Sequence, residues 1–94
     1  MFASVRHYHI DPQKMDDLVK RIPGAVDVIS SLTGFRAYYV VRGDDGSIAT
    51  LSLFSNAASA ALSNQMAARW VKENAADLIG ATVETVTGEV VAYK

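Results

Sequence analysis

The order in which the hydrophobic periodicity changes along this chain of 94 residues constrains its fold more than any other feature. Apolar residues first alternate at strand spacing, then recur every three or four residues as in a helix, and both patterns return later. The segments, in the order strand, helix, strand, strand, helix and strand, are residues 1–10, 11–32, 35–42, 47–54, 56–80 and 81–93. This βαββαβ order predicts one α+β domain with a four-stranded antiparallel sheet.

Cap and turn residues stand at the boundaries that this order requires. Asp11 can cap the free amides of the first helix, and Pro12 suits its first position, where no N–H is needed. Pro23 inside that helix predicts either a kink or two abutting helices. The turn 44–46, Asp-Asp-Gly between two apolar runs, predicts a hairpin, and Asn56 is the expected cap of the second helix. These boundaries favour a ferredoxin-like fold.

Composition limits the class of protein and its partners. Half of the residues are apolar and a fifth are charged, which is typical of a globular chain, and the length suits a single domain over residues 1–94. The net charge is −1 with dispersed basic residues, so no nucleic-acid partner is expected. There is no cysteine for a disulfide or a thiol site. No segment has the length of a membrane span or the pattern of a signal peptide, so we expect a cytoplasmic protein without a membrane partner.

Both faces of the predicted sheet carry apolar residues. In a βαββαβ domain the two helices cover one face, and the other face must be polar or must find a partner. Tyr39 and Val41 alternate with Tyr38 and Val40, so neither face of that strand is polar. The sequence therefore predicts a homodimer formed through the open sheet face. The alternative is a monomer in which turn and edge positions blur the alternation.

Five stretches together resemble one family. They are Val5–Tyr8, Leu32–Tyr39, Phe54–Ala61, Trp70–Asn74 and Gly88–Val90, and the Gly-Phe-x-x-Tyr run within the second is the sharpest. The chain resembles the antibiotic biosynthesis monooxygenase-like domains of the dimeric α+β barrel superfamily. The resemblance implies two ferredoxin-like protomers whose sheets face each other, with a ligand pocket between helices and sheet in each. Some members oxidise aromatic polyketides without metal or flavin, others degrade haem, and many have no known activity.

The resemblance also implies roles for particular residues. Characterised monooxygenase members use a set of Asn, Trp and Tyr with the Trp on the second helix, where Trp70 lies in this sequence. The available partners of that Trp are Asn64, Asn74, Tyr8 and Tyr39. Haem-degrading members need a histidine after that Trp, and this chain has none after His9, which argues against haem degradation.

Trp70 and the histidines are candidates on their own chemistry. Trp70, beside Met66 and on the same side of the helix as Asn74, either forms an aromatic wall for a planar substrate or simply fills the core. His7 can act as a general base near neutral pH. His7 and His9 have the spacing of two metal ligands, but no third His or Cys exists, so we expect exposed or interface histidines and no metal.

The first strand also carries polar residues that alternate with the histidines. Arg6, Tyr8 and Tyr39 either face inward and orient a phenolate or carboxylate, or have a structural role. In the structural alternative Arg6 forms an ion pair across the strands with Glu84 or Glu89.

The sequence is compatible with three functions. The first is a cofactor-independent monooxygenase for an aromatic or polyketide-like molecule, with Trp70, His7 and Tyr39 as catalytic residues. His7 or a tyrosinate would deprotonate the substrate, and the substrate-binding candidates are Arg6, Tyr8, Asn64, Met66 and Asn74. The second is a non-catalytic binding protein for a hydrophobic small molecule. The third is a structural dimerisation domain, in which Met66, Trp70 and Leu51 would pack without a cavity.

Overall fold

The structure is a computed structural model that describes the backbone of residues 1–94 and the side chains of residues 1–80 and 84–94. A short 3-10 helix precedes the first α-helix, and the other elements follow the predicted order. They are β1 (Phe2–Ile10), the 3-10 helix (Pro12–Lys14), α1 (Met15–Ser30), β2 (Phe35–Arg42), β3 (Ser47–Phe54), α2 (Ala57–Asn74) and β4 (Ile79–Glu89). The βαββαβ order is confirmed.

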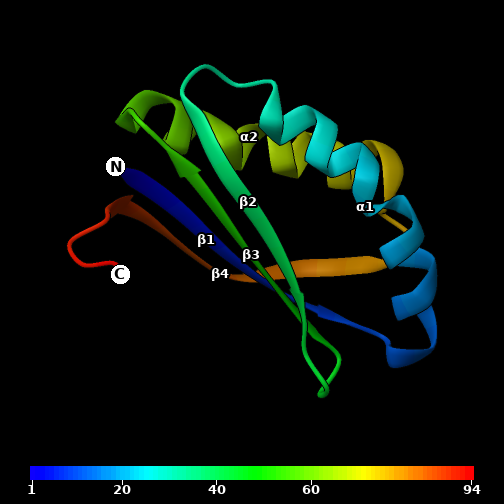
Figure 1. Cartoon of the computed structure of the whole chain (residues 1–94). Helices are drawn as coiled ribbons and strands as arrows, with labels where there is room; N and C mark the ends of the chain where they lie inside the picture. Colours follow the sequence, from blue (N-terminus) through cyan, green and yellow to red (C-terminus); the bar gives the residue numbers. More distant parts are fainter.

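The two helices form one layer over a single face of a curled sheet (Figure 1). The strand order is β2-β3-β1-β4, and each neighbouring pair is antiparallel. This is the ferredoxin-like arrangement that the sequence predicted. Within the described part of the chain, neither helix is long and apolar enough to cross a membrane.

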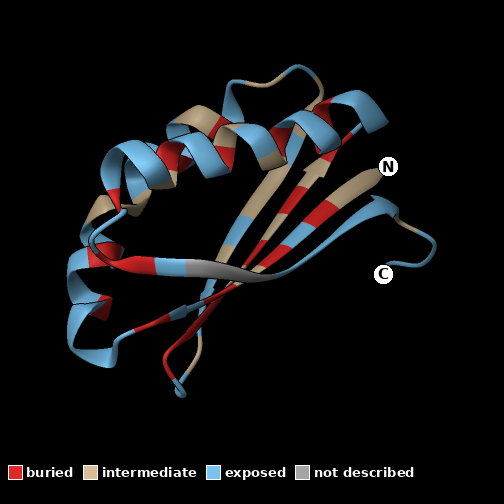
Figure 2. Cartoon of the chain, turned by 180° about the vertical axis from the view of Figure 1, so that it is seen from behind, coloured by how far each residue is buried: buried red, intermediate tan, exposed pale blue. Residues whose placement is uncertain are grey.

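Strand β1 lies in the interior of the sheet, so its alternation decides what each face carries. Ser4, Arg6, Tyr8 and Ile10 are buried beneath the helices, whereas Val5, from the other set, is 40% exposed. Figure 2 shows the buried residues concentrated along the inner strands and on the helix sides that face them. The helix-covered face therefore holds both the apolar core and a group of buried polar side chains.

A short 3-10 helix lies between Asp11 and the start of helix α1. The Asp11 carboxylate accepts a hydrogen bond from the Gln13 amide (3.0 Å) and so caps the 3-10 helix, while α1 itself starts at Met15. Pro23 lies inside a single helix, so the alternative of two abutting helices is not what forms. Figure 1 shows the axis of α1 bending part-way along, as expected where proline removes a backbone hydrogen bond.

Helix α2 is shorter than the sequence suggested. We expected it to continue to Gly80, but it ends at Asn74, and β4 begins at Ile79 rather than at residue 81 and ends at Glu89. Asn74 Nδ2 donates to the carbonyl oxygen of Trp70 (3.1 Å), which satisfies a carbonyl of the last turn. The chain then turns and buries Leu78 and Ile79 in the core. Burial of these two side chains outweighs the helix propensity of the segment.

The hairpin between β2 and β3 has a three-residue loop, 44–46. The Gly43 amide donates to the Ser47 carbonyl oxygen (2.9 Å), and Gly46 has a φ of +85°. A glycine with positive φ at the end of a three-residue loop is a recurrent hairpin geometry. The loop pairs Arg42 with Ile48, and this register decides which face each β2 side chain occupies.

Replacing Gly46 with alanine is expected to lower the free energy of unfolding by about 1–2 kcal/mol, because an L-residue is strained at positive φ. A Cβ there would also lie 3.0 Å from the Ile10 carbonyl oxygen. Gly88→Ala is the control, since a Cβ at Gly88 meets nothing within 4 Å and its φ is not positive. Urea unfolding measures both variants. If the free energy of unfolding falls equally in the two variants, the positive φ of Gly46 is not what the hairpin requires.

Candidate functional site

A small apolar cavity lies between the two helices and the sheet. Its volume is about 30 Å³, and α1 supplies Leu18, Ile22 and Ile29 to its wall. A space of this size accommodates one or two water molecules or a group of a few atoms. An aromatic ring therefore enters only if the side chains or helices around the cavity move apart.

The cavity has an aromatic side. Trp70 from α2, Tyr8 from β1 and Tyr38 from β2 all line it, and Trp70 is only 8% exposed. The indole packs on α1 at Gly24, where an added Cβ would lie 3.2 Å from Trp70 Nε1. Glycine inside a helix costs about 1 kcal/mol relative to alanine, so Gly24 serves the close approach of the two helices at Trp70.

A cluster of buried polar groups lies on the same face of the sheet. Arg6 Nη1 donates to Asn64 Oδ1 (2.9 Å) and to Ser63 Oγ (3.3 Å), both on α2. Ser4 Oγ also donates to Asn64 Oδ1, and Asn64 Nδ2 donates to Thr87 Oγ1 on β4 (2.8 Å). These bonds join α2 to β1 and β4. Asn64, a substrate-binding candidate from the sequence, is thus engaged with protein groups on both ends of its amide.

Arg6 does not form the predicted ion pair. It is 2% exposed, and its hydrogen-bond partners are Ser63 and Asn64 rather than Glu84 or Glu89. The register explains this for Glu84, which pairs with His7 and so belongs to the opposite face of the sheet from Arg6, whereas Glu89 pairs with Phe2, four residues away from Arg6 along β1. Arg6 Nε and Nη2 have no hydrogen-bond partner among the described residues.

Thr50 connects the polar cluster to the cavity. It pairs with Arg6 across β1 and β3, is 5% exposed, and lines the cavity. Its Oγ1 also lacks a hydrogen-bond partner within the described part of the chain. The cavity therefore has apolar and aromatic walls with a buried polar group at one border. The chemistry of this lining is that of small-molecule sites, although such sites are about ten times larger than this cavity.

His7 and Tyr39 lie on the open face of the sheet. Tyr39 is 55% exposed, and His7 lines a shallow hollow of about 230 Å³ together with Val5, Glu84 and Val86. The structure thus places Trp70 on one side of the sheet and the other two catalytic candidates on the other. Within one chain the three do not share a pocket.

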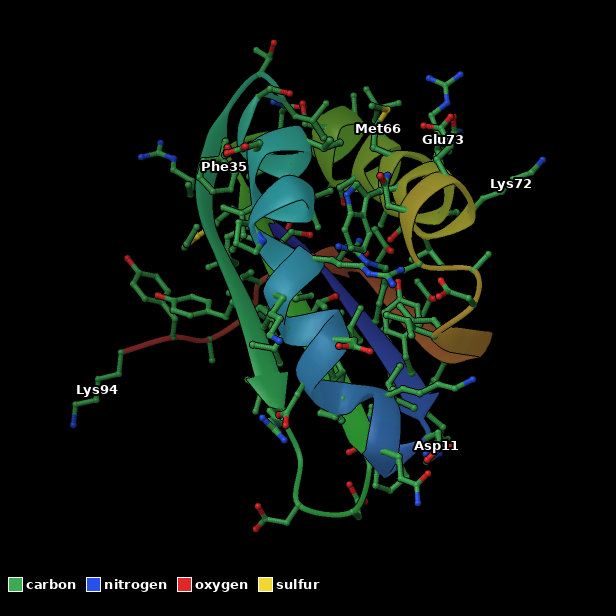
Figure 3. All side chains as sticks on the ribbon, turned by 90° about the vertical axis from the view of Figure 1, so that its right-hand side faces the viewer. Asp11, Phe35, Met66, Lys72, Glu73 and Lys94 are labelled. Carbon is green, nitrogen blue, oxygen red and sulfur yellow. The ribbon has the colours of Figure 1, made fainter. Side chains whose placement is uncertain are left out.

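The remaining sequence candidates are dispersed. Asn74 ends α2, and its carbonyl oxygen accepts from Arg21 Nη1 (2.8 Å), an arginine that also bonds Asp77 and lowers the pKa of that carboxyl. Met66 packs in the second core cluster near Phe35, away from the cavity lining. Figure 3 shows Met66 at the helix layer, while Lys72 and Glu73 of the same helix project outward.

No metal-binding cluster forms among the side chains that the structure describes. The rings of His7 and His9 are 5.9 Å apart, and no group of three His, Asp or Glu side chains gathers there or elsewhere in the described ranges. Leu51, which the alternative of a structural dimerisation domain placed beside Trp70, lies across from Val5 and Tyr39 and so belongs to the open face.

Sequence reasoning missed Tyr38 and Thr50. Tyr38 pairs with Ser52 and faces the helices, whereas its neighbour Tyr39 pairs with Leu51. The signal that could have separated the two tyrosines is the loop length, because a three-residue loop pairs Gly43 with Ser47 and sets the face of every residue in β2. Thr50 then follows, as it lies two residues from Ser52.

The comparisons with known proteins identify the fold. No protein-family model matches the sequence, and no curated protein matches it. Solved structures do match it. A protein of unknown function from Nitrosomonas europaea has a TM-score of 0.76 and 21% identity over 99% of this chain and 91% of its own.

Two provisionally named antibiotic biosynthesis monooxygenases also match. The one from Chloroflexus aurantiacus has a TM-score of 0.71 and 18% identity, covering 99% of this chain and 95% of its own. The one from Nitrosomonas europaea has a TM-score of 0.78 and 10% identity, covering 98% and 100%. The fold is that of the antibiotic biosynthesis monooxygenase-like domains. Because the identities are low, what these proteins share with this chain is the fold.

Thr50→Val is expected to raise the free energy of unfolding by about 1 kcal/mol, because it removes a buried hydroxyl without a partner while keeping the side-chain volume. The control is Ser52→Ala on the same strand and face. Ser52 Oγ bonds the Ser4 carbonyl oxygen (3.4 Å) and Ser63 Oγ (3.3 Å), so its loss should cost about 1 kcal/mol. Chemical denaturation measures the free energy of unfolding of both variants. If both substitutions lower it, the Thr50 hydroxyl is not an unpaired buried group.

Proposed function

We propose that this protein is a small enzyme of the monooxygenase type that binds an aromatic or polyketide-like molecule in the cavity beneath Trp70. The observation that carries the proposal is the meeting of an aromatic, apolar cavity with a buried polar group at its border. The structural likeness to proteins named antibiotic biosynthesis monooxygenases supports the same reaction class. The apolar walls suit a ring, and the polar border suits an oxygen atom on it.

The proposed reaction needs no redox group beyond the substrate and dioxygen. A phenol or enol that has lost its proton is electron-rich and can pass electrons directly to dioxygen. A ring methylene then becomes a carbonyl, one oxygen atom enters the product, and the other leaves as water with the two hydrogens of the methylene. The four electrons that reduce dioxygen are the two electron pairs of the C–H bonds that break, whose hydrogens leave as protons and end in the water molecule, so atoms and electrons balance.

The groups placed to exchange a proton in this cavity are tyrosines. Tyr8 and Tyr38 line it, whereas His7 lies on the opposite sheet face. The acceptor must be a tyrosinate, which forms when Tyr8 or Tyr38 first passes its own hydroxyl proton to solvent. Proton transfer from a phenolic substrate to a tyrosinate then exchanges one phenolate for another, so its driving force is small in either direction. We therefore favour a tyrosinate over His7 as the proton acceptor, with Trp70 stacking against the ring.

A binding protein without turnover is the second candidate. It is favoured by one observation, that the described lining residues include tyrosines but no histidine and no carboxylate. Both candidates predict a ligand under the helices, and they differ in whether dioxygen is consumed. A purely structural domain predicts no ligand at all.

Trp70→Phe is expected to weaken binding of a phenolic ligand and to lower any oxygen uptake, because the smaller ring covers less of the substrate. The measurement is a thermal-shift screen with phenols and quinones, followed by oxygen uptake with each compound that binds. A ligand of the folded state raises the melting temperature with concentration. Tyr39→Phe, on the other sheet face, is the control and should behave as wild type. Equal ligand affinity and oxygen uptake in Trp70→Phe and wild type would show that the cavity beneath Trp70 is not the ligand site.

We also propose that the protein is a homodimer through its open sheet face. Large apolar side chains are exposed there. Val5, Tyr39, Val41 and Val86 are 40%, 55%, 57% and 59% exposed and share this face. A contiguous apolar patch of this kind is rare on a monomer and typical of an interface. A second copy offers a matching face by symmetry.

Val86→Lys is expected to dissociate the dimer, because it puts a charge into the middle of the proposed interface. Val19→Lys makes the same change at a 42% exposed valine on α1 and should leave the assembly unchanged. Sedimentation velocity at micromolar concentration measures both. A wild-type protein that sediments as a stable monomer would contradict the dimer.

A further inference from the structure

The guanidinium of Arg6 has an unused edge. Of its three nitrogens only Nη1 is bonded, to Ser63 Oγ and Asn64 Oδ1, while Nε and Nη2 lack partners among the described residues. Nε–H and one Nη2–H point the same way, on the side of the guanidinium opposite Nη1. This is the pair of parallel donors with which arginine holds the two oxygens of a carboxylate.

The charge of Arg6 is also unbalanced within the chain. Arginine stays protonated in proteins, so burial to 2% exposure does not remove the charge. Three surface arginines each pair with a carboxylate: Arg21 with Asp77, Arg42 with Asp16 and Arg69 with Glu73. The buried arginine, by contrast, is bonded only to neutral groups in the described part of the chain. A buried cation without a counter-charge is costly, which suggests that an anion from outside completes it.

The partners of Arg6 do not depend on it. Asn64 Oδ1 also accepts from Ser4 Oγ, and Ser63 Oγ donates to the Ala60 carbonyl oxygen (2.7 Å). Both groups would remain bonded if Arg6 were replaced by an apolar residue. A role in holding α2 on the sheet therefore does not explain why a charged residue is buried here.

The cavity begins beside Arg6. Thr50 is its partner across β1 and β3, and Tyr8 is the next residue on the same face of β1; both line the cavity. On α2, Ala67 lies one turn beyond Ser63 and lines the cavity as well. Thr50 thus forms the polar border of a space whose other walls are apolar and aromatic, and Arg6 lies next to Thr50 just outside the lining.

We propose that Arg6 binds the carboxylate of an aromatic acid, through Nε and Nη2, while the ring of the acid lies against Trp70 in the cavity, which widens as the surrounding side chains move apart. The Thr50 hydroxyl donates to one of the carboxylate oxygens. A carboxylate fits better than a phosphate, because the site offers a single guanidinium edge and one hydroxyl. This inference rests on the proposed function in one respect, that the cavity beneath Trp70 is the ligand site, and it narrows the ligand to a planar acid.

The test compares benzoate with benzamide, which has the same shape without the charge. Benzoate should raise the melting temperature of the wild-type protein with saturation, and benzamide should bind at least about tenfold more weakly. Arg6→Met should lose about ten- to a hundredfold in affinity for benzoate and keep its affinity for benzamide. Arg6→Lys keeps the charge but not the paired donors, and it should also bind benzoate more weakly than wild type.

Two measurements keep the test decisive if a variant folds poorly. The melting temperature of Arg6→Met without ligand should equal or exceed that of wild type, because an unpaired buried charge has been removed. In the wild-type protein, the Arg6 Nε–H resonance should shift with benzoate concentration and saturate at the same dissociation constant. Binding of benzoate without a shift of that resonance would overturn the proposal, as would equal affinity for benzoate and benzamide or no benzoate binding.

The outcomes separate this inference from the proposed function. If phenols bind and benzoate binds equally well to wild type and Arg6→Met, the cavity is a ligand site but Arg6 does not hold an acid. If benzoate binds through Arg6 and no compound consumes oxygen, Arg6 has the assigned role and the monooxygenase proposal fails.

Discussion

The pairing of β1 with β3 on one side and β4 on the other is the constraint on which the rest of the molecule depends. An interior strand can present only alternate residues to each face, so one register assigns Ser4, Arg6, Tyr8 and Ile10 together to the side beneath the helices. A shift by one residue would bury Val5 and the histidines instead. This register determines three features: the burial of Arg6, the lining of the cavity and the apolar character of the open face.

The helix-covered face combines features that stability alone does not favour. An apolar core would be better served by an aliphatic residue at position 6 and by valine at position 50, since neither Thr50 Oγ1 nor two of the Arg6 nitrogens find partners in the described structure. Groups that break the local rules of packing in this way are expected at functional sites. The polar border of the cavity is thus the part of the molecule whose sequence is best explained by a ligand.

Much of the fold could be predicted from the sequence, since it depends on local signals. The two central strands have the bounds that the apolar runs indicated, and the side chain of Asn56 accepts from the Ser59 amide (2.8 Å) as the expected cap of α2. The end of α2 could not be predicted in the same way. The residues after Asn74 favour a helix locally, and only the burial of Leu78 and Ile79 against other elements decides against it.

The candidate site was harder to predict, because adjacent residues of similar type lie on opposite faces. Tyr38 and Tyr39 are chemically identical, and the face of each depends on a hairpin loop of three residues. The position of Trp70 on the apolar side of α2 could be predicted from the helical spacing. Its neighbours in the cavity could not, because they come from strands that are distant in the sequence. The unused edge of Arg6 depends on three-dimensional packing, so no sequence pattern could have predicted it.

The central claim is that a ligand binds beneath the helices rather than on the open sheet face. Trp70 is the only tryptophan of the chain, so its indole N–H gives a single resonance that reports on the cavity, while His7 reports on the open face. Titration with a phenolic acid followed by both signals tests the claim most directly. We expect a saturable shift of the Trp70 resonance with little change at His7. A shift confined to His7, or none at Trp70 when binding is complete, would contradict the account.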